Sequence, residues 1–354
     1  MSAATIKEIM AEAFETYSQY EEIEFDFHGG EIALAFSEIV DACEWFWNRK
    51  WNKPHLCFAT TNGTLIHGPV QDWFAQNKSR FWLGLSLDGT PEMHDFNRSG
   101  SYNMIDINFF LKTWPAQQIK MTISPDTLFS LAKGIFHIHN LGFQVSANLA
   151  NGVDWSDLTY AREYSRQLQM LVDFYLSRPE IPPAKLLSFP LLKTGFGVLH
   201  PDLARYQHQY CGCGREITCY GPDGRKYPCQ AFQPSTNAVD GHKVSQSIDF
   251  NDTALFLDQA CSGCLLEYAC PTCYGHNYFE RGAMNVRDKR MCLMRKIEAL
   301  ASSYLYGMML SDDKSYAACA TVSPQEKSLM VEGIRHIQET YKNLLPETLN
   351  HEKS

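Results

Sequence analysis

The sequence has 354 residues, of which 45% are hydrophobic and 20% are charged, so it can bury a large core and suggests a globular protein of two domains. Its net charge of -9 argues against a nucleic-acid partner. No apolar run approaches a membrane span, and the N-terminus lacks the features of a secretory signal, which predicts a cytoplasmic protein without membrane contact.

The first predicted element is an amphipathic helix within the N-terminal segment MSAATIKEIMAEAFETY. Helical spacing places Ile6, Ile9, Met10, Ala13 and Tyr17 on one face of this helix.

Five strands are predicted next, each separated from the following one by a stretch long enough for a helix. This order is typical of successive βα units around a parallel sheet. The strands are expected in IEFDFHGG, HLCFATTNG, FWLGLSLDG, IKMTIS and FQVSANLA, which begin at Ile23, His55, Phe81, Ile119 and Phe143.

Most of these strands alternate apolar and polar residues, unlike ordinary parallel strands, which are apolar on both faces. Glu24, Asp26 and His28 share the polar face of the first strand, and Ser86 and Asp88 share that of the third. Helices outside and a polar face inside predict a curved, partly open barrel whose lumen holds a polar ligand. The alternative is a sheet with one side exposed to solvent.

Three strands end in turns that contain small or polar residues. Ligands of α/β proteins gather at the carboxyl ends of parallel strands, and glycine lets the backbone approach a bound molecule. Glu31 could also accept hydrogen bonds from an ammonium group. The candidate ligand-binding residues in these turns are Gly29, Gly30, Glu31, Asn62, Ser86 and Asp88.

Nine of the twelve cysteines lie in one stretch of the second half. In a reducing compartment such a run indicates metal ligation rather than disulfides. Eight thiolates could hold two iron–sulfur clusters, and the spacing fits a pair of four-thiolate zinc sites equally well. The predicted metal ligands are Cys211, Cys213, Cys219, Cys229, Cys261, Cys264, Cys270, Cys273 and Cys292.

Two helices are predicted near the C-terminus. The first covers residues 292 to 310, with Leu293, Ile297, Leu300, Tyr304 and Met308 on one stripe. The second begins after Ser323-Pro324, where Glu326 completes a capping box, and its apolar stripe consists of Met330, Ile334, Ile337, Tyr341 and Leu344.

The order of these motifs resembles the radical S-adenosylmethionine (AdoMet) enzymes that carry a SPASM extension, including the anaerobic sulfatase-maturase-like enzymes. FHGGE is similar to the family's Gly-Gly-Glu-Pro motif, which binds the methionyl amino group. TTNGT and LSLDGT are similar to the strand ends that line the same pocket. CGCGREITCYGPDGRKYPC and CSGCLLEYACPTC, followed by Cys292, resemble the SPASM cluster domain.

The resemblance implies an α/β fold: a partial (β/α) TIM-like barrel of radical SAM type that lacks its first strand, a cysteine-rich SPASM auxiliary-cluster domain and C-terminal helices. The expected boundaries are 1–176 for the barrel, 177–204 for a proline-rich linker, 205–300 for the SPASM domain and 301–354 for a helical tail. The segment that normally carries the first strand is expected to be truncated or lost.

The resemblance also favours iron over zinc and implies two auxiliary [4Fe-4S] clusters. One would be bound by Cys261, Cys264, Cys270 and Cys292. The other would be bound by Cys229 and Cys273 with two from Cys211, Cys213 and Cys219, which leaves one cysteine spare. In this interpretation Gly29, Gly30 and Glu31 hold the methionyl part of AdoMet, while Asn62, Ser86 and Asp88 face the nucleoside.

In complete members of this family, reductive cleavage of AdoMet yields a 5'-deoxyadenosyl radical that abstracts hydrogen from a peptide. The implied partners are a peptide or protein substrate and a reductant such as flavodoxin or ferredoxin, and thioether crosslinking is one such reaction. The cysteine triplet CxxxCxxC that binds the catalytic cluster does not occur in the 354 residues, so the chain as written is expected to be inactive. No catalytic residue is assigned.

Two departures narrow the expected activity. Ile32 replaces the family's proline after Gly-Gly-Glu, and Gln230 stands where sulfatase-maturing relatives have an acidic proton acceptor. Glutamine cannot act as a base, which argues against sulfatase maturation. The alternative functions are a non-catalytic iron–sulfur scaffold or partner protein, and a zinc-binding interaction module.

Overall fold

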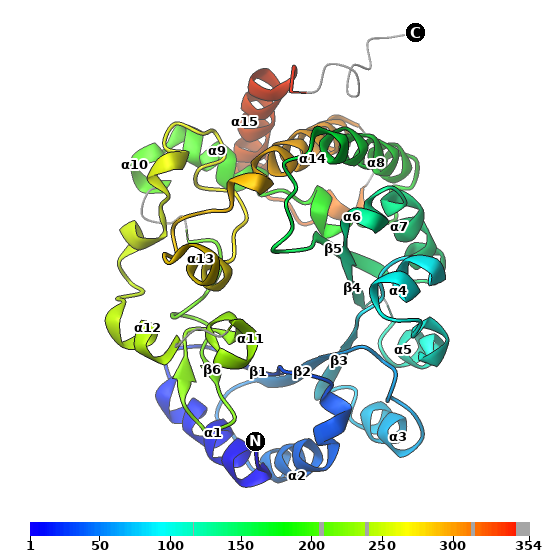
Figure 1. Ribbon diagram of the computed structural model, residues 1–354, viewed down its shortest axis with the longest axis vertical. Coiled ribbons are helices and arrows are strands. Elements are labelled where there is room, and N and C mark those ends of the chain that lie inside the picture. Colours follow the sequence, from blue (N-terminus) through cyan, green and yellow to red (C-terminus); the bar gives the residue numbers. More distant parts are fainter. Residues whose placement is uncertain (116, 205–208, 238–240, 313–315, 345–354) are drawn as a thin grey trace.

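The elements of the protein follow one another around a ring, with strands on the inner side of one half and helices outside them (Figure 1). The structure is a computed structural model that describes residues 1–115, 117–204, 209–237, 241–312 and 316–344. Within these residues no helix combines the length and apolar character that crossing a membrane requires.

Five parallel strands form the inner wall of this half. The first three pair in the order β1-β2-β3 and the last two pair as β4-β5. A bridge between Ser86 and Lys120 joins the end of β3 to β4 and makes the wall continuous. All five predicted strands are confirmed: β1 Ile23–Phe27, β2 His55–Thr61, β3 Phe81–Leu85, β4 Gln118–Ile123 and β5 Gln144–Leu149.

The predicted alternation of buried and exposed residues is clearest in β4, where Ile119, Met121 and Ile123 are buried while Lys120 and Thr122 are exposed. The third strand departs from the prediction. Ser86 and Asp88, expected on the wet face, are only 8% and 2% exposed. Ser86 pairs with Lys120 of β4, and Asp88 is covered by Arg98 and the Thr122 backbone, so the elements that follow β3 bury both residues.

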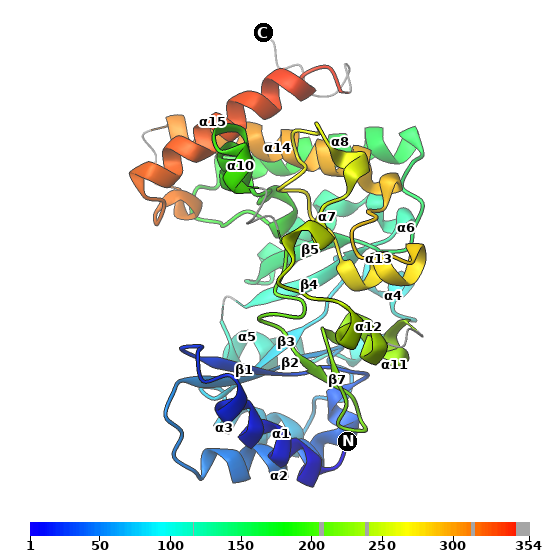
Figure 2. The ribbon, with the colours of Figure 1, turned by 90° about the vertical axis from the view of Figure 1, so that its left-hand side faces the viewer.

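Helices cover the outer side of the strands (Figures 1 and 2). Several begin at side chains that accept backbone hydrogen bonds, such as Thr90, Asp106, Ser124 and Asp157. These helices are α2 Phe36–Trp47, α3 Pro69–Gln76, α4 Pro91–Asn97, α5 Ile107–Thr113, α6 Pro125–Leu128, α7 Leu131–Asn140 and α8 Leu158–Ser177.

The main core lies between this layer of helices and the strands. Cys43 and Cys57 belong to it: both are fully buried and their sulfur atoms lie 4.0 Å apart. These two cysteines are therefore packing residues rather than members of the cysteine-rich segment.

The cysteine-rich half begins with a short hairpin that closes the ring against the N-terminal helix. The helix α1 spans Ala3–Thr16, and the hairpin consists of β6 Cys219–Tyr220 and β7 Lys226–Tyr227. Lys226 Nζ lies 2.6 Å from Glu12 Oε1, and Tyr17 donates a hydrogen bond of 2.8 Å to Thr218. The ring is therefore closed where α1 meets the hairpin.

The remaining helices are α9 Leu191–Leu199, α10 Pro201–Ala204, α11 Pro234–Asn237, α12 Gly241–Ser247, α13 Tyr274–Arg281, α14 Cys292–Ser311 and α15 Pro324–Tyr341. Short 3-10 turns connect the elements: η1 Ile32–Ala35, η2 Tyr102–Met104, η3 Lys185–Leu187, η4 Gln230–Phe232, η5 Thr253–Phe256, η6 Gln259–Cys261, η7 Lys289–Met291 and η8 Ala317–Cys319. The helix α14 packs against both α8 and α15.

Both predicted C-terminal helices are present. The capping box at the start of α15 is confirmed, because Ser323 accepts from the Glu326 backbone while Glu326 accepts from the Ser323 backbone. The stripe predicted for α14 is only partly right. Met308 is 55% exposed, and the middle of the helix is buried on most sides because it lies between α8 and α15.

Candidate functional site

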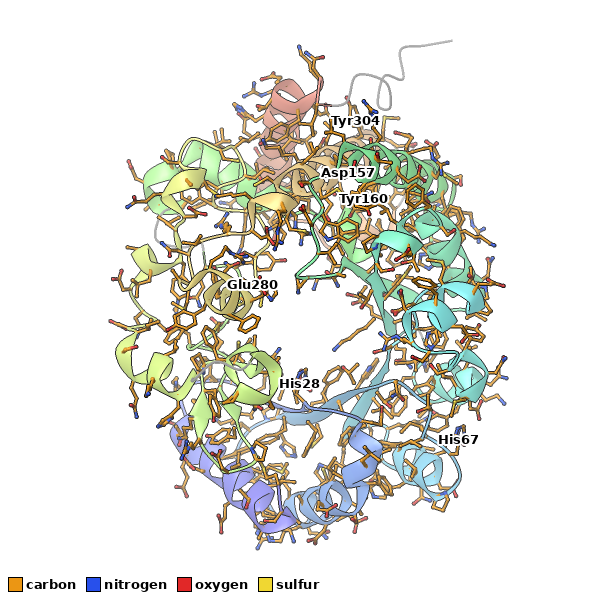
Figure 3. All side chains as sticks on the ribbon, in the orientation of Figure 1. His28, His67, Asp157, Tyr160, Glu280 and Tyr304 are labelled. Atoms are coloured by element: carbon orange, nitrogen blue, oxygen red, sulfur yellow. The ribbon has the colours of Figure 1, made fainter. Side chains whose placement is uncertain are left out.

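The candidate ligand-binding residues lie where the parallel strands end. Figure 3 places His28, which follows β1, on the inner side of the ring. Glu24 and Asp26 have the same alternation along β1 and therefore share this face. Burial raises the pKa of both carboxyl groups, while the charge of Lys120 acts in the opposite direction. All three side chains remain exposed, so the inner face along β1 is polar and accessible.

Glu31 links the ends of the first two strands. Its carboxylate accepts hydrogen bonds from Thr61 Oγ1 at 2.6 Å and from the Asn62 backbone at 3.0 Å. It also accepts from the Ala33 backbone at 3.3 Å and so caps η1. Gly29 and Gly30 beside it are exposed. A cation reaching this corner would meet a carboxylate that is already held in place.

Asn62 shapes the turn after β2. Its side-chain oxygen accepts from both the backbone and the hydroxyl of Thr64, at 2.9 and 2.8 Å. The following Gly63 has a φ of 81°, which side chains rarely adopt, and an added methyl group would meet Leu85. The turn is therefore fixed by its own residues.

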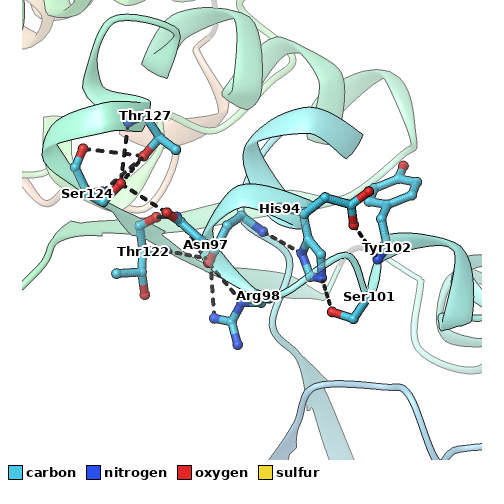
Figure 4. Close-up of polar contacts among 10 residues, drawn as sticks. His94, Asn97, Arg98, Ser101, Tyr102, Thr122, Ser124 and Thr127 are labelled. Carbon is cyan, nitrogen blue, oxygen red and sulfur yellow. Dashed lines mark hydrogen bonds and ion pairs between the residues drawn. The ribbon is translucent and has the colours of Figure 1, made fainter.

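Asp88 is tied into the protein by several hydrogen bonds, and Figure 4 labels its partners His94, Arg98 and Thr122. Its carboxylate accepts from Arg98 at 2.8 and 3.2 Å and from the Thr122 backbone at 2.8 Å. Its own backbone donates to His94 Nδ1 at 3.2 Å. The residue connects β3, α4 and β4, a positioning task that its sequence pattern did not indicate.

Five of the nine clustered cysteines come together at one end of the cysteine-rich half. We call these the first cysteine group: Cys211, Cys213, Cys219, Cys229 and Cys273. A hydrogen bond between Cys213 and Cys229 raises the pKa of Cys213 and lowers that of Cys229. Burial raises the pKa of Cys211, and the nearby thiols of Cys229 and Cys273 raise it further. Burial also raises the pKa of Cys219 to about 11, and Cys229 adds to that rise.

The other four form the second cysteine group: Cys261, Cys264, Cys270 and Cys292. Burial raises the pKa of Cys292, and Cys261 and Cys264 raise it further while Lys289 opposes them. Burial raises the pKa of Cys270 to about 11, against the charges of Arg287 and Arg295. All four thiols line one cavity of about 410 Å³ that extends to the end of β5 and to η3.

The donor set fits iron–sulfur clusters. All twelve cysteines are free thiols, and the clustered nine divide into two groups that each contain at least four. Four thiolates are the usual ligands of a four-iron cluster. No set of three or more Cys, His, Asp or Glu side chains in the described ranges lies close enough to hold a single metal ion.

Basic residues around the second cysteine group are the functional candidates that sequence reasoning missed. Lys289 donates to Cys261 Sγ at 3.0 Å, and Arg295 forms a 2.6 Å ion pair with Glu298. Arg287 lines the same cavity and is 6% exposed. The run RDKRMCLMRK, which surrounds Cys292, was the available signal, because thiolates favour nearby cations.

Comparison with known proteins gives a structural likeness only. No protein-family model and no curated protein matches the sequence. Among solved structures, anSMEcpe with bound AdoMet superposes with a TM-score of 0.65 and 17% identity, covering 88% of this chain and 90% of that one. The same protein with AdoMet and a Kp18Cys peptide gives a TM-score of 0.62 at 17% identity, covering 86% and 89%.

A third structure, anSMEcpe with AdoMet and a Cp18Cys peptide, gives a TM-score of 0.54 at 18% identity and covers 96% of this chain and 90% of that one. The expected architecture, a partial barrel followed by a cysteine-rich half and helices, is thereby confirmed. The chain has the radical SAM/SPASM type of fold seen in anSMEcpe, an anaerobic sulfatase-maturating enzyme.

Proposed function

We propose that the protein is an iron–sulfur protein of the radical SAM/SPASM type that acts on a ribosomal peptide or protein substrate. The observation that carries the proposal is the sorting of nine cysteines into two groups beside the polar inner face of the strands. The likeness to anSMEcpe, whose structures contain AdoMet and a peptide, supports the same substrate classes here.

In this proposal the second cysteine group holds one auxiliary [4Fe-4S] cluster. The first group supplies five thiols for the four ligand places of the other cluster. Bound clusters of this kind accept and donate single electrons. Lys289 and Arg295 place positive charge beside the second group and so favour the thiolate forms that bind metal.

The strand ends form the proposed AdoMet site. The carboxylate of Glu31 is available to the methionyl ammonium group while Thr61 and the Asn62 backbone orient it. Asp88 keeps the turn after β3 in place through Arg98 and Thr122 rather than by reaching the ligand itself. Hydrogen abstraction, thioether formation included, is the expected chemistry of a complete enzyme of this type.

Metal analysis after anaerobic reconstitution tests the proposal. We expect about eight irons per chain, the content of two four-iron clusters. Replacing Cys292 with alanine removes a ligand of the second cysteine group and should reduce the content to about four irons. Cys319 lies outside both groups, so Cys319→Ala is the matched control and should keep the full content. Stoichiometric zinc with little iron would overturn the proposal in favour of a zinc-binding interaction module.

A further inference from the structure

Arg287 is a nearly buried cation whose charge has no partner among the described residues. Its side chain is 6% exposed, and its Nε and Nη1 atoms are buried without any hydrogen bond. Only its backbone is engaged, donating to Asp258 Oδ2 at 3.0 Å. Leaving a guanidinium group in this state is costly, because burial removes its hydration without a compensating contact.

Three basic residues close to Arg287 in the sequence or in the cavity are each paired with a carboxylate. Lys289 lies 2.7 Å from Asp258, Arg295 lies 2.6 Å from Glu298, and Arg290 lies 2.7 Å from Asp288. Glu298 is held further by a 2.8 Å hydrogen bond from Tyr164. Lys185 and Lys296 line the cavity without a carboxylate partner too, but Lys185 is exposed and Lys296 is half-buried. Among the described basic residues of this cavity, Arg287 is therefore the buried one whose charge lacks a counterion.

The carboxylates of Asp258 and Asp288 near Arg287 already pair with Lys289 and Arg290, whereas the second cysteine group would become anionic when it binds a cluster. Arg287 lines the 410 Å³ cavity together with Cys261, Cys264, Cys270 and Cys292. It also interacts electrostatically with Cys270. A four-iron cluster with four thiolate ligands carries net negative charge, and hydrogen bonds to its sulfur atoms tune its reduction potential.

We propose that Arg287 donates hydrogen bonds to the cluster held by the second cysteine group and raises its reduction potential. The proposal rests on the proposed function, since it requires that this group binds iron–sulfur. The reduced cluster carries one more negative charge than the oxidised one, so a nearby guanidinium stabilises the reduced form more. Arg295 contributes less charge because Glu298 neutralises it, although its Nε is also buried without a partner.

The experiment compares three reconstituted full-length chains: the unsubstituted protein, Arg287→Met and Arg290→Met. A redox titration followed by electron paramagnetic resonance measures the midpoint potential of each cluster. We expect Arg287→Met to shift one of the two clusters to a more negative potential and to leave the other unchanged. Arg290→Met removes the same charge from the surface side of this region, where Asp288 already neutralises it, and should shift neither.

If the Arg287→Met chain does not fold, Arg287→Lys takes its place as the test variant. Lysine keeps the charge but lacks the planar fork of donors, so we expect a smaller shift in the same direction and of the same cluster. Two intact clusters with unchanged potentials in Arg287→Met, or in Arg287→Lys where only that variant folds, would overturn the proposal. Zinc in place of iron in the unsubstituted chain would instead overturn the proposed function, so the two failures are distinguishable.

Discussion

Single residues near the strand ends have tasks that composition and spacing do not reveal. Asp88 was predicted to face a ligand, yet its carboxylate is occupied by Arg98 and the Thr122 backbone. Those partners arrive from α4 and β4, so only the folded chain brings them together. Glu31, in contrast, could be placed from sequence at a strand end, and the structure puts it there, held by Thr61 and Asn62.

His94 makes the turn after β3 sensitive to pH. Its Nδ1 accepts from the Asp88 backbone at 3.2 Å, and its Nε2 lies 3.1 Å from the Ser101 hydroxyl, so the bonded ring is neutral. Burial lowers the pKa of His94, while the charge of Asp88 acts in the opposite direction. The His94 imidazole is therefore harder to protonate in the folded protein than in the unfolded chain. The contribution of neutral His94 to the stability of the fold is present above about pH 6.5 and decreases as the pH falls below that value.

Replacing His94 tests this pH dependence of stability. His94→Asn should lower the melting temperature at pH 7.5, because the bond to Asp88 is weakened, but it should reduce the further loss of stability between pH 7.5 and pH 5.5. Thermal melts across that range measure both effects. His200→Asn, at an exposed position, is the control and should keep the pH dependence of the unsubstituted protein. If the melting temperature fell equally between pH 7.5 and pH 5.5 in His94→Asn and in the unsubstituted protein, His94 would not be the source of this pH dependence.

Among the elements, those with local signals were predictable and those defined by distant contacts were not. The start of α15 was predicted because Ser323 and Glu326 lie in one turn and cap each other. The helices that pack against α9 could not be predicted, because the residues of α9 lie in a proline-rich stretch that indicated a linker. In the structure α9 crosses α15 closely, and Gly195 and Gly333 allow the two backbones to approach.

This crossing supports a prediction about helix packing. A methyl group at Gly195 would collide with the backbone oxygen of Leu329, which cannot move without shifting α15. Gly195→Ala should therefore reduce the free energy of unfolding by about 1–3 kcal/mol, the usual range for overpacking. Gly307 in α14 is the matched control, since its nearest neighbours would lie 3.6 Å from the new methyl group.

Gly307→Ala should be neutral or stabilise the protein by about 0.5–1 kcal/mol, because alanine is the better helix former. Urea unfolding followed by circular dichroism measures both variants. A loss at Gly307 as large as the loss at Gly195 would show that close helix contact is not the cause.

The whole molecule is a ring closed by contacts between the N-terminal helix α1 and the β6–β7 hairpin in the middle of the chain. The alternation of apolar and polar residues predicted the strands of the barrel half, because it depends on short stretches of chain. Metal binding, predicted from the cysteine spacing, stays a prediction. The sequence did not indicate that α1 would meet the β6–β7 hairpin through Glu12 and Lys226, since those residues lie far apart along the chain. The contact brings the first cysteine group near the first strand, where Asp26 acts electrostatically on Cys219.

The 354-residue chain as a whole is expected not to cleave AdoMet reductively. AdoMet is cleaved reductively when its amino and carboxylate groups chelate an iron that lacks a cysteine ligand. Each cysteine group here can supply four thiolates, and the sequence contains no CxxxCxxC triplet for a third cluster. We therefore expect the reconstituted chain to release almost no 5'-deoxyadenosine under strong reduction, as measured by chromatography, even with about eight irons bound.

A chain extended at its N-terminus by a strand and a three-cysteine loop is the matched comparison. It should cleave AdoMet, because Glu31 and the polar side chains of β1, β4 and β5 remain in place to position it. An extended variant whose three added cysteines are alanines should return to the low level. Robust cleavage by the 354-residue chain alone would mean that one cysteine group leaves an iron open to AdoMet, and the first group, with five thiols around four places, would then be the one to examine by single alanine substitutions.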